Sequence, residues 1–162
     1  MKILFLGDSI TEGYGASCYE TSYVPLIANK LNADVRNYGV SGTRIARQTF
    51  ILEWMCHSNF DMNLRTEIME KDADCVVLLG GTNDYGIGCA PLGNENDTDV
   101  FTFYGAVNTL LDKLISTYGK DKLIIVLPLP RLNEGNVDGH DPRFKRGLKT
   151  TLKQYVDKSS SN

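Results

Sequence analysis

Three short turns of glycine and small polar residues each follow an apolar run, and their residue types suit acyl-transfer chemistry. The turns are Gly7-Asp8-Ser9, the glycine pair Gly39 and Gly42, and residues 80–84. Ser9 offers a hydroxyl nucleophile, Gly42 a backbone N–H that no side chain obstructs, and Asn83 a side-chain amide donor. A nucleophile with converging N–H donors can form and stabilise the oxyanion of a tetrahedral intermediate. The turns therefore predict a site for acyl transfer.

Alternating elements would bring these turns together. Short apolar runs predict strands at residues 3–6, 34–37, 75–79 and 123–127, and helical spacing predicts helices at 22–31, 44–56, 60–70, 101–118 and 143–157. Residues 85–99 predict a surface loop that shapes the substrate pocket, with Asp99 as the cap of the next helix. This alternation is typical of an α/β fold with a parallel sheet. Its strands end at one edge, where ligands bind.

Length and composition restrict the class of protein. The 162 residues predict a single domain, 1–162, and the net charge of −3 gives no electrostatic footprint for nucleic acid. No apolar run reaches the roughly 18 residues needed to span a membrane. The first strand lacks the features of a signal peptide, so a cytoplasmic location is expected. The four scattered cysteines predict neither a disulfide framework nor a zinc site.

At these positions the sequence resembles a known family. Gly7-Asp8-Ser9-Ile10, Asn37-x-Gly39-x-Ser41-Gly42 and Gly81-Thr82-Asn83-Asp84 are similar, in order and spacing, to three of the four signature blocks of the SGNH (GDSL-type) hydrolases. The resemblance covers roughly residues 1–131. It implies a flavodoxin-like three-layer sandwich whose parallel sheet has the strand order 2-1-3-4. It also implies a serine esterase or lipase that acts on a small-molecule carboxylic ester. No metal or cofactor is expected.

The resemblance also implies roles for individual residues. Ser9 would be the nucleophile and, through its N–H, one donor of the oxyanion hole. Gly42 would supply a second backbone donor, and Asn83 a side-chain donor. Asp8 would hold the turn rather than act in catalysis.

The fourth block of the family, Asp-x-x-His, supplies the general base and is not matched. The chain has two histidines, His57 and His140. The stretch around Asp138-Gly139-His140 is one residue too short, and no fifth strand precedes it. The favoured hypothesis is a C-terminally shortened member that lacks its fifth strand and its Asp/His block. The exposed edge of the fourth strand would then invite pairing with another chain, so a homodimer is one expectation.

A competing hypothesis retains a complete catalytic unit. His140 would fold back over the first strand and serve as the base, with Asp138 or Asp141 as its orienting carboxylate. His57 is a weaker candidate and is expected to end a helix. Arg131, Tyr14 and Tyr85 follow the strand ends closely enough to line a pocket, although surface roles suit them equally.

Two other classes of function fit the same architecture. The first is a catalytically impaired ester-binding domain, which would keep Ser9, Gly42 and Asn83 but turn esters over very slowly. The second is a flavodoxin-type FMN binder. FMN needs a phosphate cradle of Ser and Thr N–H groups after the first strand, and Glu12 makes that reading unfavourable.

Overall fold

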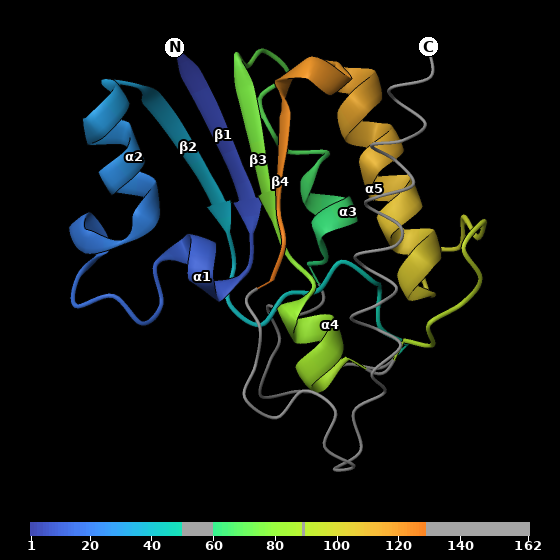
Figure 1. Cartoon of the computed structure of the whole chain (residues 1–162). Coiled ribbons are helices and arrows are strands. Elements are labelled where there is room, and N and C mark those ends of the chain that lie inside the picture. Colours follow the sequence, from blue (N-terminus) through green and yellow to red (C-terminus); the bar gives the residue numbers. More distant parts are fainter. Residues whose placement is uncertain (50–59, 89, 129–162) are drawn as a thin grey trace.

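The computed structural model describes residues 1–49, 60–88 and 90–128. In chain order the elements are β1 (Lys2–Gly7), α1 (Ser9–Glu12), η1 (Tyr19–Thr21), α2 (Tyr23–Leu31), β2 (Asp34–Gly39), α3 (Met62–Arg65), β3 (Cys75–Leu79), α4 (Thr82–Ile87), α5 (Phe103–Tyr118), η3 (Lys120–Lys122) and β4 (Leu123–Val126). Helix α2 covers one face of the sheet, and α3 and α5 lie on the other (Figure 1). The short helices α1 and α4 lie beyond the C-terminal ends of the strands.

The four strands form an all-parallel sheet in the order β2-β1-β3-β4, as predicted from the sequence. Phe5 in β1 is opposite Asn37 in β2 and Val77 in β3. Gly7, the last residue of β1, is opposite Gly39 and Leu79. This register aligns the ends of β1, β2 and β3, so the three turns that follow them start from the same edge of the sheet.

Alternate residues of the strands face two separate cores. Leu4, Leu6 and Leu78 pack against α5, whereas Phe5 and Val77 face the side covered by α2. These strands have apolar residues on both faces because both faces are buried, which explains their continuous apolar runs. The strands that these runs predicted are all present, with bounds shifted by at most two residues.

The face of β4 that points away from α5 is less covered. Ile124 is 53% exposed and Val126 is 38% exposed, and Ile124 is opposite Val77 of β3. Within the described part of the chain, β4 is an edge strand. The expectation of a homodimer through this edge remains a prediction, and the hypothesis of a missing fifth strand concerns residues outside those described.

Helix α5 begins two residues later than predicted, and its cap differs from the one expected. The side chain of Thr102 accepts a hydrogen bond from Gly105 N, which makes Thr102 the N-cap. The prediction that Asp99 caps this helix is wrong. Its carboxylate accepts instead from Phe101 N at 3.0 Å and closes the preceding turn.

Three other predictions of local structure need correction. Residues 44–49 are not helical, because their N–H groups bond to Asp84 and to Val100 O rather than within a helix. Residues 60–70 contain only the four-residue α3, followed by turns. Residues 85–87, predicted as loop, belong to α4. For residues 44–49, contacts distant in sequence determine the backbone, and periodicity cannot detect them.

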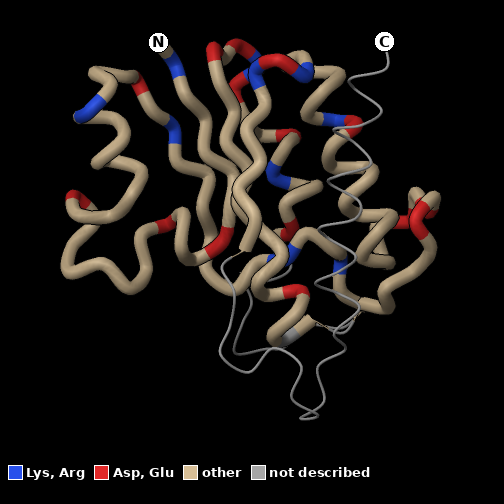
Figure 2. Tube along the Cα trace, viewed as in Figure 1, with Lys and Arg blue, Asp and Glu red and all other residues tan. Residues whose placement is uncertain are grey.

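Charged side chains close the opposite, N-terminal edge of the sheet. Lys and Arg alternate with Asp and Glu around the starts of the strands, at the top of Figure 2. Lys2 pairs with Glu70 at 2.7 Å and Asp72 at 2.9 Å, and Arg36 also pairs with Glu70. These pairs lie away from the edge that carries the three turns. No helix of the described residues is long and apolar enough to cross a membrane.

Candidate active site

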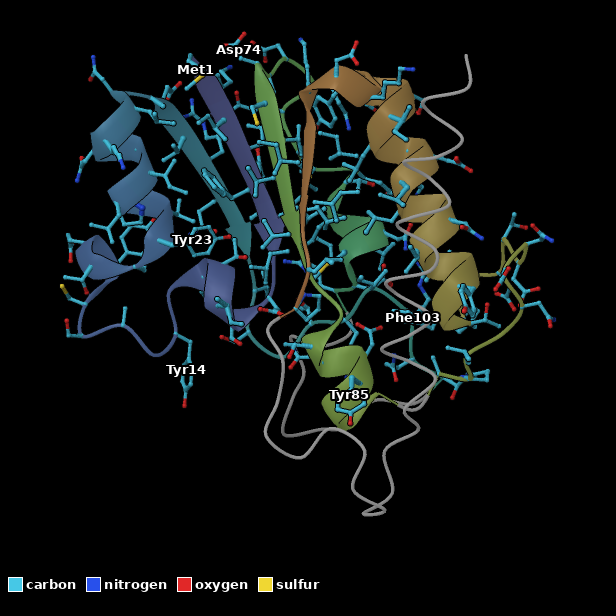
Figure 3. All side chains as sticks on the ribbon, in the orientation of Figure 1. Met1, Tyr14, Tyr23, Asp74, Tyr85 and Phe103 are labelled. Atoms are coloured by element: carbon cyan, nitrogen blue, oxygen red, sulfur yellow. The ribbon has the colours of Figure 1, made fainter. Side chains whose placement is uncertain are left out.

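The three turns lie together at the C-terminal edge of the sheet. Figure 3 shows Met1 and Asp74 at one edge and Tyr14 and Tyr85 at the opposite edge, beside α1 and α4. Tyr14 is 81% exposed and points away from the sheet, so it does not line an enclosed pocket here. Tyr85 lies on α4 and is half-buried.

Ser9 is the first residue of α1 and is half-buried, directly after the fully buried Asp8. The carboxylate of Asp8 caps the helix by accepting from Ile10 N at 3.0 Å. This contact agrees with the expected role of Asp8 in holding the turn. A side chain at Gly7 would meet Thr11 Oγ1 at 1.9 Å, so glycine is required for α1 to fold back over the end of β1. The N–H of Ser9 is among those of a first helical turn that have no intrahelical partner.

The turn after β2 is held by α1. Gly42 has φ = +74°, a left-handed conformation that favours glycine. The carboxylate of Glu12 accepts from Ser41 N at 2.7 Å and also from Ser41 Oγ. Asn37 Nδ2 donates to Thr11 O at 2.7 Å, while its Oδ1 accepts from Gly39 N at 2.8 Å. The turn that contains Gly42 is therefore fixed relative to the helix that starts with Ser9.

Asn83 connects the end of β3 to the same turn. Its Nδ2 donates to Thr43 O at 2.9 Å, which orients the side-chain amide next to Gly42. An amide nitrogen has two hydrogens, so this contact leaves the second available to a ligand. The structure thus brings Asn83 and the Gly42 turn together, with α1 tied to the turn through Glu12.

The neighbouring Asp84 is buried and fastens residues after the Gly42 turn to α4. Its carboxylate accepts from Ile45 N at 3.0 Å and from Ala46 N at 2.8 Å. Burial raises the pKa of Asp84 from 3.8 to about 6, although these two hydrogen bonds and the charge of Arg44 oppose the shift. Asp84 therefore holds residues 45 and 46 against α4. Its carboxylate becomes protonated in mildly acidic solution.

Replacing Asp84 with Asn should destabilise the protein. Ile45 N and Ala46 N donate to different carboxylate oxygens, and the amide keeps only one of these two acceptors. We expect a loss of about 1–3 kcal/mol in the free energy of unfolding at pH 7. The native state binds the Asp84 proton more tightly than the unfolded chain does, so the contribution of Asp84 to stability increases as pH falls through the window between about 6 and 3.8.

The amide introduced by Asp84→Asn does not titrate, so the stability gap between variant and wild type should widen by about 1–3 kcal/mol between pH 7 and pH 4.5. Urea unfolding of both proteins at the two pH values measures the gap. The other carboxylates are the same in both proteins, so their contributions to the pH dependence of the free energy of unfolding cancel in the difference. A gap that stays constant or narrows on acidification would contradict the raised pKa.

Three scaffolding roles were not predicted from the sequence. From the sequence, Glu12 only makes FMN unfavourable, Asp84 is only part of the third motif, and Arg65 is only a position in the helix predicted at 60–70. Arg65 is in fact 1% exposed. These roles depend on hydrogen bonds to residues that are distant in the sequence, and a single sequence does not show which distant residues are in contact.

The candidate base His140 lies outside the described residues, as do Asp138, Asp141, His57 and Arg131. The described ranges contain no group of three or more His, Cys, Asp or Glu side chains that could hold a metal ion.

Comparison with known proteins identifies the family. The model of the GDSL-like lipase/acylhydrolase family matches residues 5–158. A Lactobacillus plantarum protein of known structure is 25% identical, with a TM-score of 0.74 over 96% of this chain and 73% of that one. Proteins from Bacteroides ovatus and Bacteroides uniformis, both classed as GDSL-like lipases, superpose with TM-scores of 0.69 and 0.72.

The two Bacteroides proteins are 20% and 19% identical to this chain, so they support the fold alone; each alignment covers 96% of this chain, and 81% and 79% of theirs. A search of curated proteins found no match. The family match spans nearly the whole chain and includes all three turns of the candidate site. The chain therefore belongs to the GDSL-like lipase/acylhydrolase family.

Proposed function

We propose that this protein is a serine hydrolase that cleaves a small carboxylic ester through an acyl-enzyme, with Ser9 as nucleophile. Family membership supports ester hydrolysis in general. The observation that carries the specific proposal is the arrangement of the three strand ends. Ser9 starts α1 at the edge where Asn83 Nδ2 is held 2.9 Å from Thr43 O, beside Gly42. The proposal uses no metal or cofactor.

In the proposed reaction, Ser9 Oγ attacks the ester carbonyl carbon and its proton passes to a general base. The carbonyl oxygen becomes an oxyanion, stabilised by the N–H groups of Ser9 and Gly42 and by the amide of Asn83. Collapse of the intermediate breaks the bond to the alcohol, which leaves with the proton from the base. Water then hydrolyses the acyl-enzyme by the same sequence, releasing the carboxylic acid and restoring Ser9.

For the base we propose His140, with Asp138 as the carboxylate that orients its ring. A serine hydroxyl at neutral pH needs such a base, and an imidazole is the usual one. In the sequence, His140 comes after β4, and β4 itself ends at the edge of the sheet where Ser9 lies.

A second candidate function is an impaired ester-binding domain with the same pocket. One observation favours it: the sequence does not match the Asp-x-x-His block that supplies the base, because Asp138-Gly139-His140 is one residue too short. Such a protein would bind esters with Gly42 and Asn83 and hydrolyse them very slowly.

A fluorophosphonate probe separates the two candidates, because it reacts with a serine only when the hydroxyl is activated. The hydrolase proposal predicts one label per chain in the wild type and none in Ser9→Ala, read by intact-protein mass spectrometry. A folded wild type that takes no label would reject the hydrolase and favour the binding domain.

Asn83→Ala should lower kcat by about 10²–10³-fold with little change in KM, because the amide is expected to contact the oxyanion rather than the ground-state ester. Steady-state kinetics with p-nitrophenyl acetate measure both constants. Asn29→Ala, which removes an exposed amide from α2, is the matched control. A rise in KM at constant kcat would argue that Asn83 only binds the substrate.

A further inference from the structure

A buried arginine lies behind the candidate site. Arg65 ends α3, is 1% exposed, and is among the largest fully buried side chains of the described residues. Its guanidinium donates to three acceptors from separate parts of the chain. Nη1 lies 2.7 Å from Gly7 O and 2.5 Å from Tyr38 O, and Nη2 lies 2.7 Å from Thr43 Oγ1.

Each acceptor adjoins one part of the site. Gly7 is the last residue of β1, two positions before Ser9. Tyr38 is in β2, immediately before the turn that leads to Gly42. Thr43 follows Gly42.

Thr43 also links Arg65 to the end of β3, because its carbonyl accepts from Asn83 at 2.9 Å. One planar group therefore connects, directly or through Thr43, the ends of all three strands that present the proposed nucleophile and oxyanion donors.

Helix α3, which carries Arg65, is held in place by hydrogen bonds of its own cap and of Asn63. Asp61 caps the helix by accepting from Leu64 N and pairs with Arg47 Nε at 2.8 Å. Asn63 Nδ2 donates to Ala106 O of α5 at 3.0 Å. These contacts fix α3 against α5, and they thereby fix the backbone that carries the Arg65 guanidinium.

The guanidinium keeps its charge in this setting. Burial lowers the pKa of Arg65 to about 10, against the opposing charges of Asp61, Asp8 and Glu12. A pKa of about 10 leaves the group protonated at neutral pH. All three of its hydrogen bonds are therefore charge-assisted, which makes them stronger than neutral ones.

We propose that Arg65 is the positioning residue of this site, a central clamp that holds Ser9, Gly42 and Asn83 in the geometry required for oxyanion stabilisation. The inference rests on the proposed serine hydrolase, because the clamp is defined by the donors of that reaction. Arginine is required because a lysine ammonium is a point charge and cannot span three acceptors in one plane.

Arg65→Lys tests the clamp while keeping the charge. We expect kcat for p-nitrophenyl acetate to fall about 10–100-fold with KM within about threefold, since misplaced donors weaken transition-state binding more than substrate binding. Arg36→Lys is the matched control, because Arg36 is opposite Leu4 within the β1–β2 ladder and pairs with Glu70 instead of with the three turns. Its kinetic constants should equal those of the wild type.

The double variant Arg65→Lys/Asn83→Ala separates positioning from general damage. If Arg65 acts through the oxyanion donors, the two losses should overlap, and the double variant should be little slower than the slower single one. Losses that multiply fully, or an unchanged kcat in Arg65→Lys, would overturn the proposal. Should Arg65→Lys not fold, Thr43→Val removes one acceptor of the clamp and should produce the same split between kcat and KM.

A second readout does not depend on turnover. Val40 N donates to Gly7 O and Thr43 N donates to Val40 O, so both amides report on the clamped turn. Their hydrogen exchange should accelerate at least about tenfold in Arg65→Lys and remain unchanged in Arg36→Lys. If the wild type takes no fluorophosphonate label, the proposed function fails, and exchange alone decides the clamp: unchanged exchange in Arg65→Lys would then reject it.

Discussion

Ser9→Ala should lower kcat for p-nitrophenyl acetate by about 10⁴–10⁶-fold, because the reaction would lose its nucleophile. The expectation follows from the position of Ser9 at the start of α1, beside the turn that contains Gly42. Any residual rate would reflect attack by water near the oxyanion donors. Steady-state kinetics and acyl-enzyme detection by mass spectrometry should agree, with no covalent intermediate in the variant.

The fold should survive this substitution. Asp8, not Ser9, caps α1 through Ile10 N, so we expect the free energy of unfolding to change by no more than about 0.5 kcal/mol. Ser116→Ala is the matched control, since Ser116 is exposed on α5 and its hydroxyl donates to Lys113 O, far from the candidate site. A Ser9→Ala protein that retains more than about one tenth of the wild-type kcat would exclude Ser9 as the nucleophile.

The strands could be predicted because the information is local, and their order followed from the family resemblance. Residues 3–6 and 75–79 are continuously apolar, and this pattern is typical of strands that are buried on both faces. Parallel topology then brings the turns after these strands to one edge. Ser9 and Asn83 could therefore be assigned to one candidate site before any coordinates were known.

The short elements could not be predicted because long-range contacts determine them. Residues 44–49 have an apolar spacing compatible with a helix, but the Asp84 carboxylate binds two of their N–H groups in a non-helical conformation. Helix α3 is only four residues long, far below the length at which helical periodicity is informative. Here tertiary hydrogen bonds override local propensity.

The scaffold of the site was hidden for a related reason. A charged residue in a sequence is expected at the surface, since burying an unpaired charge is costly. Arg65 is buried with its Nη1 and Nη2 donating to backbone carbonyls of two strands and to Thr43, partners separated from it by 22 to 58 positions, while its Nε has no partner among the described residues. The groups proposed to react could be identified from sequence patterns. The groups that position them could be identified only from the contacts in the folded structure.

His140→Asn should have an effect as large as that of Ser9→Ala if His140 is the base. We expect a fall in kcat of about 10⁴–10⁶-fold, since Ser9 would no longer be deprotonated as it attacks. The wild type should lose activity on acidification as the imidazole becomes protonated, and this acidic limb should disappear from the residual activity of the variant. Kinetics of kcat/KM from pH 5 to pH 9 measure both effects.

His57→Asn is the matched control and should retain wild-type kinetics. The chain contains only these two histidines, so the pair of variants tests every imidazole it can offer. A large loss in His57→Asn alone would transfer the role of base to His57. If neither substitution changes kcat, ester turnover uses no histidine of this chain. The proposal for His140 would then be wrong, and a slow reaction supported only by Gly42 and Asn83 would favour the ester-binding domain.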